Sequence, residues 1–236
     1  MISVILAGGL GTRISEETHN KPKPLVPIGG KPILWHIMMI YYAQGVKDFI
    51  IAGGYKVETI EPEMHKWLKD FPDINWDVLD TGLNTATGGR IRKCFEYCDA
   101  PKIFATYGDG VSDVNLINLL NSHNSHNHTA TLTCVRPPAR FGRVEITGNL
   151  VTKFGEKNQS EEGWINGGFF VLNRSVIELI ESYEMPFELD PLSRLADQGK
   201  LGAHLHEGFW QPMDTLRERN DLESLWDSGV APWKIW

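Results

Sequence analysis

The sequence is poor in cysteine and has no long hydrophobic run. Its three cysteines, Cys94, Cys98 and Cys134, are too few and odd in number for a disulfide framework, which favours a reducing compartment. No apolar run approaches the roughly 20 residues that a membrane span needs, and the N-terminal segment lacks the basic start and cleavage site of a signal peptide. We therefore expect a cytoplasmic protein that does not insert into membranes.

Positive charge is also scarce. The 23 lysines and arginines stand against 30 aspartates and glutamates, which gives a net charge of −7. A broad basic surface for a nucleic-acid backbone is therefore not expected, and any anionic ligand must be bound by a local cluster of basic side chains. At 236 residues, of which 42% are hydrophobic, the chain can bury a core as one domain.

The first half alternates short apolar strands with helical segments. Its first strand, Ile2–Ala7, is continuously apolar, as is typical of a strand buried on both faces of a parallel sheet. The pattern predicts further strands and helices, namely strands at Phe49–Ile51, Trp76–Leu79 and Lys102–Thr106 and helices at Pro32–Gln44, Val57–Lys69 and Arg90–Tyr97. We expect an α/β fold: an open, mostly parallel, Rossmann-like sheet with helices on both faces and ligands at the carboxyl ends of its strands.

The second half predicts a mixed or antiparallel extension of this sheet, because long helices are missing between its first strands. The expected elements are strands at Thr129–Val135, Val144–Ile146, Leu150–Phe154, Trp164–Leu172 and Leu201–His206, and helices at Ser175–Ser182, Leu189–Gln198 and after Asp214.

Two groups of side chains raise the question of a metal site. His123, His126 and His128 crowd the stretch Asn121–His128, where a solvated, turn-rich loop is favoured over metal capture. Cys94 and Cys98 stand four residues apart on an expected helix, which would suit zinc. No second pair of ligands lies near them in sequence, so buried thiols are favoured.

The strongest functional signal is the loop after the first strand, LAGGLGTR at 6–13, which is followed by KPKP at 21–24. Glycines after a buried strand let backbone N–H groups approach phosphate oxygens, and Arg13 and Lys23 can neutralise their charge. The loop is not a Walker A motif. Ile14 stands where the dinucleotide fingerprint needs its third glycine, which disfavours an NAD-dependent oxidoreductase. Phosphate binding is therefore favoured over a simple glycine turn.

With these and further motifs, nearly the whole chain resembles the sugar-1-phosphate nucleotidyltransferases, which join a nucleoside triphosphate to a sugar phosphate and release pyrophosphate. The motifs are GGLGTR (8–13), KPKP (21–24), GGKPILWHIM (29–38), DTG (80–82), TGGR (87–90), YGDG (107–110), NGGFFVL (166–172), FWQPMDT (209–215) and APWK (231–234). The last four are most similar to the branch that forms CDP-glucose from CTP and α-D-glucose 1-phosphate. The resemblance implies a nucleotide-diphospho-sugar transferase fold, Mg²⁺ as cofactor and a homo-oligomer.

The resemblance also implies a role for each matching residue. The nucleotide would be bound by Leu6, Ala7, Gly8, Gly9, Gly11, Thr12, Arg13, Lys23, Thr85, Arg90 and Gly108. The sugar phosphate would be bound by Glu156, Lys157, Asn166 and Gly168. Asp109 and Asp214 would be the metal ligands, and Arg13 and Lys23 would be catalytic by stabilising charge. The single domain, 1–236, would comprise a nucleotide-binding part at about 1–115 and a sugar-phosphate-binding part at about 116–236.

The chain departs from the family pattern at two places. Asn158 stands where the family has proline after the Glu-Lys pair, and the stretch between Tyr55 and Asp80 is shorter than in the cytidylyltransferases. Open alternatives are therefore another triphosphate (UTP, dTTP or GTP) or a heptose or mannose phosphate. A non-catalytic nucleotide-sensing subunit is disfavoured because Lys23 and both aspartates are present. Of the tryptophans, Trp210 is expected near the site, whereas Trp233 and Trp236 are expected to pack the C-terminal tail.

Overall fold

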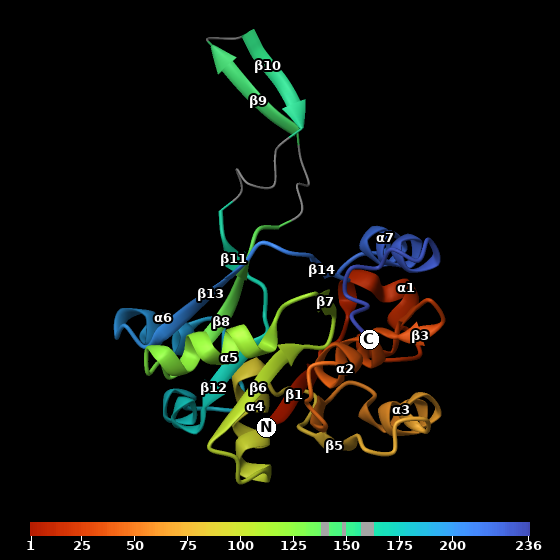
Figure 1. Ribbon diagram of the computed structural model, residues 1–236, viewed down its shortest axis with the longest axis vertical. Helices are drawn as coiled ribbons and strands as arrows, with labels where there is room; N and C mark the ends of the chain where they lie inside the picture. The colour runs from red at the N-terminus through yellow and green to blue at the C-terminus, as the bar shows by residue number, and fades with distance from the viewer. Residues whose placement is uncertain (138–141, 148–149, 157–162) are drawn as a thin grey trace.

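The computed structural model describes residues 1–137, 142–147, 150–156 and 163–236 (Figure 1). The strands of its central sheet are β1 (Ile2–Ala7), β4 (Asp48–Gly53), β5 (Asn75–Asp80), β6 (Lys102–Tyr107), β8 (Ala130–Val135), β11 (Ile165–Asn166), β12 (Phe170–Asn173) and β13 (Leu201–His206). They follow the order β11-β8-β12-β6-β1-β4-β5, and β13 also pairs with β8. Three separate strand pairs are β2 (Pro27–Ile28) with β3 (Lys31–Pro32), β7 (Gly110–Ser112) with β14 (Trp210–Pro212), and β9 (Gly142–Thr147) with β10 (Leu150–Glu156).

Helices cover both faces of the sheet. The α-helices are α1 (Ser15–Thr18), α2 (Ile33–Tyr42), α3 (Ile60–Leu68), α4 (Thr87–Tyr97), α5 (Leu116–Ser125), α6 (Asp190–Asp197) and α7 (Leu216–Asp227). Short 3₁₀ helices are η1 (Thr12–Ile14), η2 (Lys23–Leu25), η3 (Val57–Thr59) and η5 (Arg174–Leu179). None of the helices in the described part of the chain has the length and apolar character to cross a membrane.

The parallel centre of the sheet explains the continuous apolar run of β1. Strand β1 lies between β4 and β6 and is parallel to both. Because side chains alternate along a strand, Ile5 packs in the core that contains α2 and α3, whereas Val4 and Leu6 pack in the core that contains α4 and α6. Each such buried side chain contributes about 1.5–3 kcal/mol. The predicted parallel sheet with helices on both faces is confirmed.

The predicted extension of the sheet is confirmed in part. Strand β12 runs antiparallel to β6, and β8, β11 and β13 continue the same sheet. The two expected strands at 144–146 and 150–154 were wrongly placed in it, because β9 and β10 pair with each other in a separate hairpin (Figure 1). Both edges of β8 are already used, one by β13 and the other by β11 and β12, so the sheet offers them no place there.

Two expected elements have different boundaries. The strand predicted at 164–172 is interrupted, because Gly168 and Phe169 adopt left-handed backbone conformations with φ of 75° and 45° between β11 and β12. The loop predicted at 121–128 is wrong over its first half, where α5 continues to Ser125. His123 lies on the inner face of that helix and hydrogen-bonds Thr131 Oγ1 and Asn173 Oδ1, so it is buried and not part of a solvated connection.

Cys94 and the C-terminal tryptophans lie as expected, whereas Cys98, also expected to be buried, is only half-buried. Cys94 is a buried free thiol, and burial raises its pKa to about 12. Trp233 is fully buried, stacks on Phe209 and donates its Nε1–H to Nδ1 of His36. Burial lowers the pKa of His36 to about 4, so its neutral ring donates from Nε2 to the Ile28 carbonyl. The tail therefore packs on the body of the protein, and the prediction is confirmed.

Candidate active site

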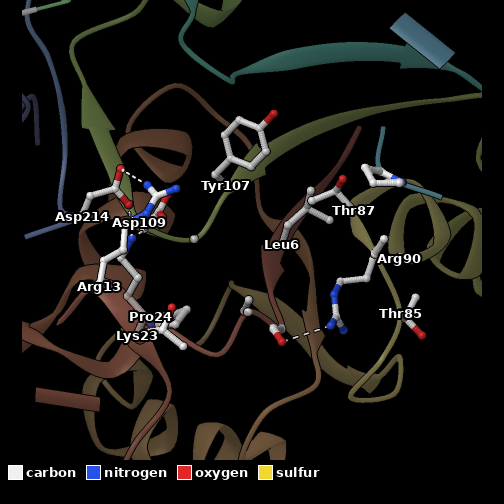
Figure 2. A pocket seen from close by; sticks show the side chains of 18 of the residues that line it. Leu6, Arg13, Lys23, Pro24, Thr85, Thr87, Arg90, Tyr107, Asp109 and Asp214 are labelled. Atoms are coloured by element: carbon white, nitrogen blue, oxygen red, sulfur yellow. Dashed lines mark hydrogen bonds and ion pairs between the residues drawn. The ribbon is translucent and has the colours of Figure 1, made fainter. Parts of the chain in front are cut away.

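A cavity of about 540 Å³ lies at the carboxyl ends of β1 and β6 (Figure 2). This is the edge where ligands of open α/β sheets bind. All eleven residues predicted to bind the nucleotide line it, and so do Asp109 and Asp214. Sequence reasoning assigned no binding role to six other residues of the wall, Ile14, Pro24, Ala86, Tyr107, Pro186 and Glu188. A carboxylate just before a helix, as at Glu188, is normally interpreted as a helix N-terminal residue, so its position in the cavity could not be recognised.

Glycine is required at two positions of the loop after β1. Gly11 has a φ of 64°, a left-handed conformation that residues with a side chain rarely adopt. Gly8 lies directly against Arg90, and a Cβ atom there would stand 2.0 Å from the guanidinium carbon. The loop can therefore adopt this backbone and pack against Arg90 only with glycine at these two positions.

The side chain of Arg90 holds this loop in place through hydrogen bonds. The side chain lies on α4 and is 4% exposed, and it donates to the carbonyl oxygens of Gly53 at 2.8 Å and Gly8 at 3.0 Å and to Thr81 Oγ1. The guanidinium thus joins the end of β1 to the ends of β4 and β5. Since these three oxygens already engage it, Arg90 holds the loop after β1 in place.

Replacement of Arg90 by lysine is expected to lower the free energy of unfolding by about 2–4 kcal/mol, because a single ammonium nitrogen cannot reproduce the planar fork whose two Nη atoms reach oxygens on different segments. The KM for the nucleotide should rise about tenfold as the loop loosens. Urea unfolding and steady-state kinetics measure both effects. Arg194→Lys, in a surface ion pair with Glu181, is the matched control and should cost less than about 1 kcal/mol. An unchanged stability of Arg90→Lys would contradict the supporting role.

Two aspartates and one lysine form the charged end of the cavity. Lys23 Nζ lies 2.6 Å from Asp109 Oδ2 and 2.7 Å from Asp214 Oδ1, and Arg13 Nη1 lies 3.1 Å from Asp214 Oδ2 (Figure 2). Burial alone would lower the pKa of Lys23, but the two carboxylates outweigh it and raise the pKa above its ordinary value. Lys23 is therefore an ammonium ion at neutral pH.

Backbone pairing brings the two aspartates together from distant parts of the sequence. Asp109 precedes β7 and Asp214 follows β14, and these strands pair so that Gly110 stands opposite Pro212. The N–H of Met213 donates to the Asp109 carbonyl at 2.8 Å. Beyond them, α7 begins with a capping box between Thr215 and Glu218, and Glu218 Oε2 also accepts from the Asp214 N–H. Both carboxylates are thus fixed before any ligand binds.

This pair of carboxylates suits a divalent cation. One oxygen of each carboxylate accepts a hydrogen bond from the Lys23 ammonium. The two carboxylates therefore stabilise positive charge at a shared position between them. Carboxylate oxygens are the ligands that Mg²⁺ prefers, and Mg²⁺ commonly binds one or two of them together with substrate phosphates. The residues present therefore fit the expected metal.

The opposite wall carries a chain of hydrogen bonds around Glu188. Tyr107 donates its hydroxyl to Glu188 Oε1 at 2.7 Å, and Thr87 donates to Oε2. Asn166 Nδ2 donates to the Tyr107 oxygen at 3.0 Å, and Asn166 Oδ1 accepts from the Gly168 N–H. Burial, with the neighbouring Glu188 carboxylate, raises the pKa of Tyr107, so its phenol stays protonated.

Asn166 and Gly168, which are expected to bind the sugar phosphate, do not line the cavity itself but lie behind its Tyr107 wall, and their role stays a prediction. Asn166 and Gly168 lie next to Tyr107, and Trp210 is also close, since its Nε1–H donates to the Gly167 carbonyl. The backbone of Glu156 ends β10, while its side chain and Lys157 lie outside the described residues. The positions of these last two side chains stay predictions.

Fold and cavity together define an α/β protein whose glycine loop and acidic pair meet at the carboxyl edge of a parallel sheet. The chain belongs to the nucleotidyl transferase family, whose pattern it matches over residues 2–218. The fold expected for such enzymes is confirmed by HddC from Yersinia pseudotuberculosis complexed with GMP-PN. That solved structure is 26% identical with a TM-score of 0.71, and the match covers 95% of this chain and 99% of that one.

Two curated relatives match over their whole lengths. Glucose-1-phosphate cytidylyltransferase of Salmonella typhimurium (strain LT2) is 48% identical, and the probable glucose-1-phosphate cytidylyltransferase of Bacillus subtilis (strain 168) is 38% identical, each with 100% of both chains covered. The first alignment spans 256 positions, against 236 residues in this chain, so the relative contains stretches that this chain lacks.

Proposed function

We propose that this protein is a glucose-1-phosphate cytidylyltransferase, which converts CTP and α-D-glucose 1-phosphate to CDP-glucose and pyrophosphate. The observation that carries the proposal is the full-length similarity to the Salmonella enzyme of that name, at 48% identity. It is supported by the cavity, which carries Lys23 and Arg13 at one end and the Glu188 carboxylate in another part of its wall, so that phosphates are favoured only at the first.

The reaction needs no covalent intermediate with the protein. An oxygen of the sugar phosphate attacks the α-phosphorus of CTP in line, a new phosphoanhydride bond forms, and pyrophosphate leaves with the electrons of the broken bond. Because the attacking phosphate is already an anion, the protein has to bring two anions together and stabilise charge at the α-phosphoryl group. The glycine loop would hold the triphosphate with its backbone N–H groups, and Lys23 and Arg13 would supply positive charge.

Asp109 and Asp214 would hold Mg²⁺, which when bound supplies positive charge to the phosphates. Lys157 and Glu156 would bind the phosphate and hydroxyls of the sugar, and Asn166 and Gly168 would line its pocket.

In this assignment residues 1–115 serve the nucleotide and residues 116–236 the sugar phosphate, although Asp214 would lie beside the nucleotide. Three free cysteines support action in the cytoplasm. The homo-oligomer stays a prediction, which sedimentation velocity tests.

We expect CTP to be preferred over UTP by roughly tenfold or more in kcat/KM. The two bases present opposite donors and acceptors at one edge, and buried partners left unpaired cost about 1–3 kcal/mol each. We expect this edge to be recognised by the Gly8–Gly9 backbone and the turn at 87–90, both at the cavity. Pyrophosphate release measured with four nucleoside triphosphates and with glucose, mannose and heptose 1-phosphates tests the proposal.

Each outcome of this panel has a definite meaning. Equal kcat/KM for CTP and UTP with glucose 1-phosphate would contradict the cytidylyl assignment but leave the reaction class intact. A preference for a mannose or heptose phosphate would replace the sugar in the proposal. Release of no pyrophosphate with any pair would favour a nucleotide-sensing subunit.

A further inference from the structure

Glu188 is a carboxylate in the cavity wall for which the proposed mechanism has no use. It lies in the segment before α6, and both of its oxygens are held by hydroxyl groups, one by Tyr107 and the other by Thr87. Thr87 is itself fixed, because its Oγ1 accepts the N–H of Phe187 at 2.9 Å. The carboxylate is therefore set in a defined orientation before a substrate binds.

The carboxylate keeps free accepting capacity at the cavity. An ionised carboxylate offers about four lone-pair sites, and the two hydroxyls of Tyr107 and Thr87 use two of them. Its negative charge repels phosphate groups, which find positive charge at Lys23 and Arg13 instead. A ligand group beside Glu188 must therefore be a neutral hydrogen-bond donor.

Three parts of the proposed substrates offer such donors: the hydroxyls of the hexose, the ribose hydroxyls of CTP and the amino group of cytosine. The hydrogen-bond network favours the hexose. The Tyr107 hydroxyl that donates to Glu188 also accepts from Asn166, which the proposed function places in the sugar pocket. Glu188 thus belongs to the same chain of contacts as the residues on the sugar side.

We propose that Glu188 is a specificity-determining residue that accepts a hydrogen bond from a ring hydroxyl of the hexose 1-phosphate, and that Tyr107 and Thr87 orient it for this contact. This inference rests on the proposed function and adds a sugar-binding carboxylate to it. A fixed charged acceptor rejects a sugar without the matching hydroxyl, because its desolvated lone pair is then left without a partner.

The test measures kcat/KM of wild type and Glu188→Gln with glucose 1-phosphate and with its 2-, 3-, 4- and 6-deoxy analogues. Wild type should disfavour one analogue by roughly tenfold or more, and the variant should lose most of that preference at this position only. The kcat/KM of the variant for glucose 1-phosphate should fall roughly 10- to 100-fold, while the KM for CTP stays within about threefold.

A matched control comes from a second Tyr–Glu hydrogen bond in the same chain. Tyr183 donates to Glu96 at 3.0 Å on the surface, so Glu96→Gln makes the same chemical change away from the cavity and should leave every sugar preference unchanged. Tyr107→Phe keeps the Glu188 carboxylate and removes one of the two hydroxyl groups that donate hydrogen bonds to it. It should raise the KM for glucose 1-phosphate about three- to tenfold, and it tests the inference if Glu188→Gln does not fold.

The remaining outcomes separate this inference from the proposed function. If Glu188→Gln lowers kcat/KM equally for all five sugars, the carboxylate has a structural role and the inference is wrong. If it changes the ratio of CTP to UTP and leaves the sugars unaffected, Glu188 contacts the base and the inference is also wrong. If wild type uses another sugar phosphate, the proposed function fails, and the deoxy analogues of that sugar then test Glu188 in the same way.

Discussion

Asp109→Asn and Asp214→Asn are each expected to lower kcat by about a hundredfold or more while the fold stays intact, because loss of one metal ligand weakens the main source of positive charge at the reacting phosphates. The structure supports equal importance for the two residues. Both carboxylates contact the same Lys23 ammonium, at 2.6 and 2.7 Å, and paired strands hold both in place. Neither can be replaced by the other.

Steady-state kinetics over a range of Mg²⁺ concentrations, with circular dichroism to check folding, measures this effect. Isothermal titration of the free enzyme with Mn²⁺ gives a second readout that does not depend on turnover. Asp99→Asn, at an exposed position that lines no part of the cavity, makes the same chemical change and should behave as wild type. A near wild-type rate at saturating Mg²⁺ for either cavity variant would show that the metal assignment is wrong.

Local sequence signals located the glycine loop, whereas Asp109 and Asp214 were assigned through the resemblance to the sugar-1-phosphate nucleotidyltransferases. The apolar run of β1 identified a strand buried on both faces, and the glycines after it placed the loop at the carboxyl edge of the sheet. Asp109 and Asp214 stand beside Gly110 and Met213, at the ends of short segments that pair in the fold. Such positions are recognisable because the chain must turn there.

Long-range pairing could not be predicted from the sequence in the same way. The hairpin β9–β10 has the same alternating pattern as a sheet strand, and local sequence does not reveal that its strands pair with each other while both edges of β8 are occupied. The role of Arg90 depends on two carbonyl oxygens and one hydroxyl oxygen from three different parts of the chain. Glu188 has no surrounding motif, and it enters the cavity through its contacts with Thr87 and Tyr107, about 80 to 100 residues away in sequence.

The distribution of charge in the cavity limits how the substrates can lie. At one end Lys23 and Arg13 are paired with Asp109 and Asp214, so phosphates fit there together with a divalent cation bound by the carboxylates. Elsewhere in the wall, Glu188 is held by neutral hydroxyl groups and repels phosphates. Two substrates that each carry phosphate must therefore place these groups together at the charged end and direct their uncharged parts away from it. In-line attack of one phosphate on the other requires this arrangement.

Lys23→Ala is expected to lower kcat by roughly 10²- to 10³-fold, the scale for loss of one group that stabilises developing charge in a site with little water. The same substitution should strengthen binding of Mn²⁺ to the free enzyme, because the Lys23 ammonium, which is buried between Asp109 and Asp214, no longer competes for their oxygens. Lys21→Ala removes a lysine of the same KPKP segment that contacts Glu17 instead, so it is the matched control and should change neither quantity.

The opposite directions of these two effects make the test specific. A variant that only disturbs the fold would lose both turnover and metal binding, whereas removal of a bridging cation lowers the first and raises the second. The competing cation lies 2.6 and 2.7 Å from the two carboxylates, within direct hydrogen-bond distance, so its removal leaves two like charges near each other that a divalent ion can neutralise. Unchanged Mn²⁺ affinity in Lys23→Ala, together with a wild-type kcat, would show that Lys23 neither balances the aspartates nor contacts the phosphates.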